Sequence, residues 1–126
     1  MTGSLSPYAV VLMPDPVERD LVALTLLRLG CSAVACKDII AAEEAIDVRK
    51  VDLLIIDVIL PGGNGLDLIA EWKTRKNLSN SRIIVISAMR FPEFVNQAKL
   101  AGAVDFLVKP VDVEMIIQRV SKWIKN

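Results

Sequence analysis

The chain has 126 residues, of which 53% are apolar, and its 15 basic residues balance 15 acidic ones. This length suits one domain with a sizeable core, and zero net charge gives no electrostatic reason to expect nucleic acid or an anionic membrane as a partner. Two cysteines and no histidine argue against a zinc or iron–sulfur site.

The N-terminal residues lack the basic start and apolar core of a signal peptide. No apolar run approaches the ~20 residues of a membrane span. We therefore expect a flexible N-terminus over residues 1–7, one domain over residues 8–126 and a cytoplasmic location. Cys31 and Cys36 are expected to be small buried hydrophobes.

The first half of the chain predicts three strands and two helices. A strand over 8–13 leads into a helix that Asp15 caps, that has Pro16 in its first turn and that ends at Gly30. A second strand over 33–36 precedes a helix that reaches about Arg49, and a third strand ends at Asp57. The apolar stripe of the first helix is supplied by Val17, Leu21, Leu24, Leu27 and Leu29.

The second half continues the alternation with helices over 65–76 and 92–101 and strands over 82–87 and 105–108. Asp112 caps a last helix with apolar residues at a helical period. Strands that alternate with helices predict a parallel sheet with helices on both faces. Right-handed crossovers favour a flavodoxin-like, doubly wound (βα)5 α/β fold with strand order 2-1-3-4-5.

Polar side chains recur where three of these strands end. Asp57 follows an apolar run and precedes a Pro/Gly turn, Ser87 ends the fourth strand, and Lys109 follows the fifth. A single Asp at a strand end commonly caps a helix or forms a turn. An acid, a hydroxyl and a lysine at the carboxyl ends of three strands instead favour a functional site.

These residue types suit transfer of a phosphoryl group. An aspartate can attack a phosphoryl donor to give an acyl phosphate, and the transition state places negative charge on three equatorial oxygens. The Lys109 ammonium, the Ser87 hydroxyl and the Ala88 amide can each contact one such oxygen.

Three motifs resemble those of a response-regulator receiver domain: 57–65 (DVILPGGNG), 86–88 (ISA) and 102–110 (GAVDFLVKP). The resemblance covers residues 10–124. It implies that Asp57 is the phosphoacceptor, that Ser87 and Phe106 are the switch residues, and that Lys109 is the family's lysine and precedes a cis peptide bond to Pro110.

The chain departs from the family pattern directly after the first strand. Receivers carry an acidic pair there that helps to bind Mg²⁺, and here Met13 and Pro14 occupy both positions. The remaining candidate ligands are Asp57, Asp15 and the backbone carbonyl of Ile59. Because a thioether and a proline offer no oxygen ligand, we expect Mg²⁺ binding to be weak or absent.

Three hypotheses follow for the function. The first is a receiver of a two-component phosphorelay that takes its phosphoryl group from a histidine kinase or phosphotransfer protein. The second is a phosphorylation-independent pseudo-receiver that acts as a protein interaction module. The third is a small α/β enzyme or flavin binder, which is disfavoured because no glycine-rich phosphate loop follows the first strand and no histidine is available as a base.

We therefore expect a signalling domain that is not an enzyme. The apolar and aromatic residues around Phe94 and Trp123 suit either an interaction surface or scattered surface hydrophobes. The resemblance to receivers favours the first and implies that a downstream protein or a second copy docks on the face of the fourth helix, fifth strand and fifth helix. No contact with nucleic acid or membrane is expected.

Overall fold

The computed structural model describes residues 6–124, and the predicted alternation of strands and helices is confirmed in them. Residues 1–5 of the predicted flexible N-terminus lie outside the described part of the chain. The strands of the main sheet are β1 (Tyr8–Leu12), β2 (Ser32–Cys36), β3 (Leu53–Asp57), β6 (Arg82–Ser87) and β7 (Asp105–Val108). The helices are α1 (Pro16–Arg28), α2 (Ile39–Ile46), α3 (Gly65–Trp72), α4 (Pro92–Ala101) and α5 (Val113–Trp123), with a short 3-10 helix η1 (Lys76–Leu78).

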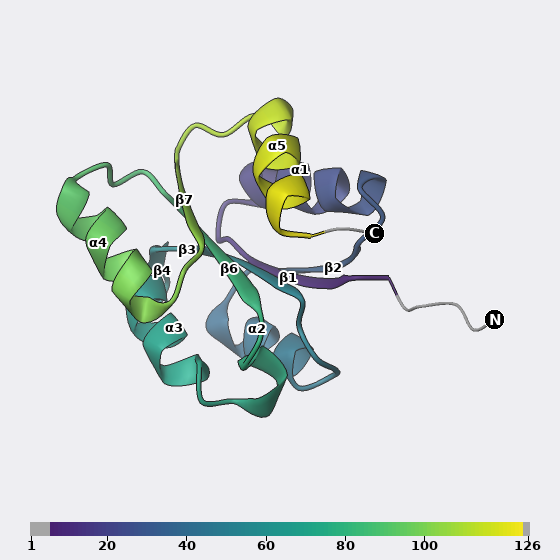
Figure 1. Ribbon diagram of the computed structural model, residues 1–126, viewed down its shortest axis with the longest axis horizontal. Coiled ribbons are helices and arrows are strands. Elements are labelled where there is room, and N and C mark those ends of the chain that lie inside the picture. Colours follow the sequence, from purple (N-terminus) through teal and green to yellow (C-terminus); the bar gives the residue numbers. More distant parts are fainter. Residues whose placement is uncertain (1–5, 125–126) are drawn as a thin grey trace.

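The five main strands form one parallel sheet in the order β2-β1-β3-β6-β7. Since β6 and β7 are its fourth and fifth strands, the predicted order is confirmed. Figure 1 shows α1 and α5 on one face of the sheet and α2, α3 and α4 on the other. The carboxyl ends of all five strands therefore lie at one edge.

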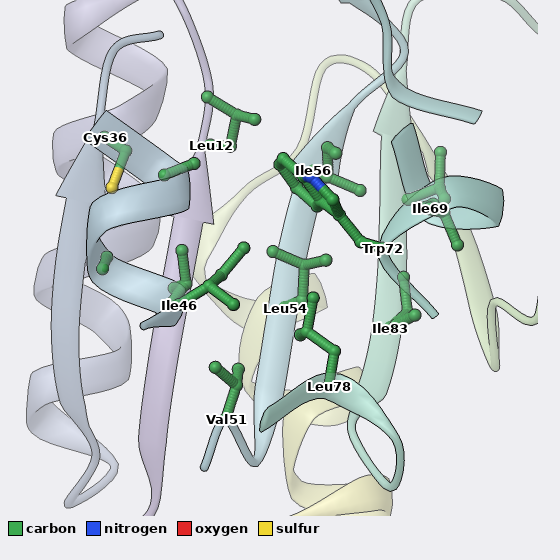
Figure 2. Packing of buried hydrophobic residues seen from close by; sticks show 14 of the residues in the cluster. Leu12, Cys36, Ile46, Val51, Leu54, Ile56, Ile69, Trp72, Leu78 and Ile83 are labelled. Atoms are coloured by element: carbon green, nitrogen blue, oxygen red, sulfur yellow. The ribbon is translucent and has the colours of Figure 1, made fainter. Parts of the chain in front are cut away.

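Each face of the sheet packs against its own apolar core. Leu54 and Ile56 of β3 point toward α2 and α3, whereas Leu53 and Ile55 point toward α1 and α5. Figure 2 shows the first core, where Trp72 of α3 extends over β3. Because β3 is buried on both faces, as its unbroken apolar run predicts, its end is a rigid place for a functional side chain.

The predicted apolar stripe of α1 is wrong in part. Val17, Leu24 and Leu27 are 77%, 57% and 51% exposed, and the buried residues of this helix are Val22, Ala23, Thr25 and Leu26. Helix α1 carries apolar side chains around most of its circumference, so its sequence does not decide which side faces the core. Packing against β2 and α5 decides which series is buried.

Two helices end earlier than predicted. Helix α2 ends at Ile46, whose carbonyl oxygen accepts a hydrogen bond from the Asn77 side chain at 2.8 Å. Helix α3 ends at Trp72, where the chain tightens because the amide of Arg75 bonds to the Trp72 carbonyl. Cys31 and Cys36 are free and buried, as predicted. Within residues 6–124, no helix combines the length and apolar character needed to cross a membrane.

Candidate functional site

Asp57 is the last residue of β3 and lies beside Ile86 of β6 in the sheet. Its side chain is almost completely buried, at 4% exposure for the residue. Oδ2 accepts a hydrogen bond from Lys109 Nζ at 2.5 Å, and Oδ1 accepts one from the Ile59 amide at 3.3 Å. Because a buried carboxylate needs a partner of opposite charge, the Lys109 ammonium accounts for its placement in the fold.

Lys109 directly follows β7, and its amide donates to the carbonyl oxygen of Ser87 at 2.9 Å. Its bond to Pro110 is cis, as the resemblance implied. Its ammonium donates to both Asp57 and Glu18, the latter at 2.7 Å. Burial would lower the pKa of Lys109, but the hydrogen bonds to the two carboxylates outweigh it and raise the pKa above its ordinary value.

Glu18 is a site residue that the sequence reasoning missed. It lies three residues after Asp15, a position at which an acid commonly helps to cap a helix. Asp15 caps α1, as predicted, and its side chain accepts from the amides of Val17 and Glu18 at 2.9 and 3.1 Å. The Glu18 carboxylate extends to Lys109. Its position in the first turn of the helix that follows β1 places it near this edge of the sheet, but no local feature of the sequence distinguishes it from a residue that helps to cap its own helix.

Ser87 ends β6 and is fully buried. Its Oγ accepts a hydrogen bond from the Met89 amide at 2.9 Å, and its residue pairs with Val108 of β7. The predicted acid, hydroxyl and lysine therefore stand on adjacent strand ends. Asp57 and Lys109 touch directly, whereas the hydroxyl is engaged with the loop that follows β6.

Phe106 of β7 is half-buried and packs against the core beneath α4. It lines a cavity of about 240 Å³ between α4 and β7, together with Val95, Ala98 and Lys99. The Phe106 ring therefore borders open space between α4 and β7.

The segment after β1 offers no side-chain oxygen where receivers carry their acidic pair. Met13 is fully buried in the core beneath α1 and α5, and Pro14 has no donor atom in its side chain. Their backbone carbonyl oxygens both accept from Arg19 Nη1, at 3.1 Å each. Within residues 6–124, no three Asp, Glu, Cys or His side chains stand close enough together to hold a metal ion.

The Pro/Gly turn after Asp57 forms a small antiparallel hairpin of β4 (Ile59–Leu60) and β5 (Gly63–Asn64). Gly62 has φ +79°, which a residue with a side chain rarely adopts. Asn64 then caps α3, since its Oδ1 accepts from the Leu66 amide at 2.8 Å. The hairpin leaves Ile59, two residues after Asp57, 61% exposed.

The sequence and the fold match a known family over most of the chain. The family model of the response regulator receiver domain matches residues 12–121. The chain belongs to this family. It is a receiver domain of two-component signalling, a class of generally non-enzymatic signalling domains, and receivers typically bind Mg²⁺ at the phosphorylation site.

Relatives and solved structures agree with this assignment. The two-component response regulator ORR8 of Oryza sativa subsp. indica is 27% identical over 120 residues, which cover 94% of this chain and 98% of that protein. A response regulator from Thermotoga maritima superposes with a TM-score of 0.84 at 25% identity, covering 97% of this receiver and all of that chain. The chemotaxis protein CheY4 of Vibrio cholerae has the same fold, with a TM-score of 0.87 at 20% identity over 94% of this receiver and 99% of that chain.

Proposed function

We propose that this receiver accepts a phosphoryl group on Asp57 from a phosphohistidine of a histidine kinase or phosphotransfer protein, without catalytic turnover of its own. The observation that carries the proposal is the buried Asp57 carboxylate with the Lys109 ammonium 2.5 Å from its Oδ2. Because Asp57 is buried at the end of a rigid strand, a phosphoryl donor can reach its carboxylate from one direction only. The Lys109 ammonium offsets the negative charge of the incoming phosphoryl group.

The transfer is a single displacement at phosphorus. A carboxylate oxygen of Asp57 forms the new P–O bond while the P–N bond to the donor imidazole breaks, and the imidazole nitrogen keeps the electron pair and takes up a proton. Negative charge is spread over the three equatorial oxygens in the transition state. Lys109 contacts one of these oxygens, and the Ser87 hydroxyl and Ala88 amide donate to another.

We further propose that this chemistry depends little on Mg²⁺. The ion prefers an octahedron of oxygen ligands, and neither Met13 nor Pro14 provides one. Asp15 is exposed and already caps α1, so it does not complete a cage with Asp57 and the carbonyl oxygen of Ile59. The residues present do not fit the ion, and we expect an affinity on the order of millimolar or weaker.

Phosphorylation is proposed to switch the face formed by α4, β7 and α5. The Ser87 hydroxyl would leave the Met89 amide for a phosphoryl oxygen, and the Phe106 ring would turn into the cavity beside it. Phe has no polar group that burial would leave without a partner, so this inward state costs little. A downstream protein or a second copy would bind the altered face.

The second candidate function is that of a phosphorylation-independent pseudo-receiver. It is favoured by one observation, the replacement of the acidic pair by a buried Met13 and by Pro14. In this case the Asp57–Lys109 pair serves the fold alone, and partner binding is constitutive.

Incubation with phosphoramidate, whose P–N bond resembles that of phosphohistidine, followed by intact mass measurement, tests the proposal. The wild type should gain one phosphoryl group with or without Mg²⁺, and Asp57→Asn should gain none. Asp67→Asn, which removes an exposed carboxylate from the first turn of α3, is the matched control and should behave like the wild type. Modification of the Asp57→Asn protein would refute the assignment, and an unmodified wild type would favour the second candidate.

A further inference from the structure

The Lys109 ammonium is held from two sides by carboxylates that come from different elements. Asp57 lies at the end of β3, 2.5 Å from Nζ, and Glu18 lies in the first turn of α1, 2.7 Å from it. The side chain of Lys109 is only 18% exposed. A lysine has a flexible four-carbon stem and three donors, so two such contacts restrict where its remaining donor points.

The first turn of α1 is itself fixed. The Glu18 amide donates to the capping carboxylate of Asp15 at 3.1 Å. The next residue, Arg19, donates to the carbonyl oxygens of Met13 and Pro14. Glu18 therefore projects from a turn that is hydrogen-bonded to the segment directly after β1, and its side chain reaches Lys109 from a fixed backbone position.

The side chains between β1 and Glu18 do not supply a carboxylate that contacts Lys109. Met13 is buried in the core and Pro14 has no acceptor in its side chain, while Asp15 is used as a helix cap. Glu18 is thus the carboxylate through which the segment after β1 contacts the site.

We propose that Glu18 is a positioning residue that holds the Lys109 ammonium at Asp57, so that the ammonium meets the phosphoryl oxygens as they arrive. The inference rests on the proposed phosphoacceptor function. Two properties of Glu18 act in opposite directions, because its oxygen orients the ammonium while its negative charge repels an incoming phosphoryl anion. The geometry of the two short contacts favours orientation as the dominant effect.

Three substitutions separate orientation from charge. Glu18→Gln keeps an acceptor oxygen at the same reach and removes the charge, Glu18→Asp keeps the charge and withdraws the oxygens by one methylene group, and Glu18→Ala removes both. The matched control is Glu114→Gln, because Glu114 also lies in the first turn of a helix and is exposed, whereas the ion pairs of Lys109 are with Glu18 and Asp57.

The first measurement is the rate of phosphoryl gain from phosphoramidate, followed by intact mass. We expect Glu18→Ala and Glu18→Asp to be at least about fivefold slower than the wild type, and Glu18→Gln and Glu114→Gln to stay within about twofold of it. Wild-type rates in Glu18→Ala and Glu18→Asp would overturn the proposal, and so would a gain in rate in Glu18→Ala.

The second measurement does not need phosphorylation. Brief acetylation of the folded proteins with an N-hydroxysuccinimide ester, read by peptide mass, reports how accessible Lys109 is relative to the exposed Lys50 in the same sample. Lys109 should be protected in the wild type and in Glu18→Gln, and should react severalfold faster in Glu18→Ala and Glu18→Asp. Thermal unfolding of each variant checks that the domain stays folded under the labelling conditions.

The two measurements distinguish failure of the inference from failure of the proposed function. If the wild type gains no phosphoryl group but the acetylation pattern is as expected, the phosphoacceptor function is wrong and Glu18 still positions Lys109. If the acetylation of Lys109 is the same in all variants, Glu18 does not position it, whatever the phosphorylation result.

Discussion

A β-carbon added to Gly65 would lie 2.1 Å from the carbonyl oxygen of Asp57. The Gly65 amide also donates to the carbonyl oxygen of Val58 at 2.7 Å, so the first residue of α3 lies directly against the end of β3. Both sides of this contact are backbone, which cannot rotate away as a side chain can. Only glycine fits, and the close approach fixes the backbone that carries Asp57.

Gly65→Ala should therefore destabilise the domain and displace Asp57. We expect a loss of about 1–3 kcal/mol in the free energy of unfolding, measured by urea denaturation, together with slower phosphoryl gain. The control is Gly63→Ala, where the nearest obstacle is a terminal methyl group of Ile39 at 2.8 Å that can move aside. A Gly65→Ala protein as stable as the wild type would contradict the close packing.

The two positions of the missing acidic pair should respond differently to aspartate. Pro14→Asp adds a carboxylate at a half-buried position and should tighten Mg²⁺ binding, measured by calorimetry, and make phosphoryl gain sensitive to a chelator. Met13→Asp places a charge in the core beneath α1 and α5 and should cost several kcal/mol of stability. Micromolar Mg²⁺ binding by the unmodified chain at this site would show that its own ligands suffice.

Alkaline pH should destabilise the domain through Cys36. Burial, with the nearby carboxylates of Asp38 and Glu44, raises the pKa of this thiol to about 11 from 9.0, while Arg19 acts in the opposite direction. The folded state therefore holds a proton that the unfolded state releases. The stabilisation is complete below pH 9 and is lost as the pH rises from 9 toward 11, with a slope of at most about 1.4 kcal/mol per pH unit for one proton.

The variant Cys36→Ala isolates this contribution. Its free energy of unfolding should be lower at pH 8, because methyl-sized packing replaces a thiol, but should fall less steeply between pH 9 and 11. Urea unfolding at several pH values measures both slopes. Equal slopes in the wild type and the variant would show that Cys36 does not contribute. The remaining slope has other sources, since the pKa values of Tyr8, Cys31 and Lys109 are also raised.

On the proposed docking face, Phe91 and Trp123 should separate binding from stability. Phe91 is 59% exposed, and its ring centroid lies 6.4 Å from that of the half-buried Phe94. Phe91→Ala should weaken self-association or partner binding at a stability cost below about 1 kcal/mol. Sedimentation, with and without phosphoramidate, measures the association.

Trp123 is instead anchored to the domain. Its Nε1 donates to Asp105 at 3.2 Å, Arg82 and Lys122 lie over its ring, and it packs against the core beneath α5. Trp123→Ala should cost about 2 kcal/mol or more in unfolding free energy. If Trp123→Ala were neutral in stability while Phe91→Ala unfolded the domain, the assignment of the two side chains would be reversed.

The sequence alone determined the class of fold and the edge of the sheet at which the site lies. The apolar run into Asp57, the glycines and prolines of the turn that follows, and the helix caps Asp15 and Asp112 are local signals. Each of these signals depends on a few neighbouring residues, so it can be recognised without knowledge of the rest of the chain. Chain crossover rules then left few sheet orders, and the predicted one is the order found.

The tertiary structure decided what depends on contacts between distant segments. Lys109 and Glu18 are 91 residues apart, and nothing local to Glu18 distinguished a carboxylate that reaches the site from one that caps its own helix. The sequence also did not determine which side of α1 is buried. Apolar residues occupy most of the circumference of this helix, so their spacing does not define one apolar face. Burial and ion pairing are properties of the surface that a segment meets, and only the packed sheet and its helices supply that surface.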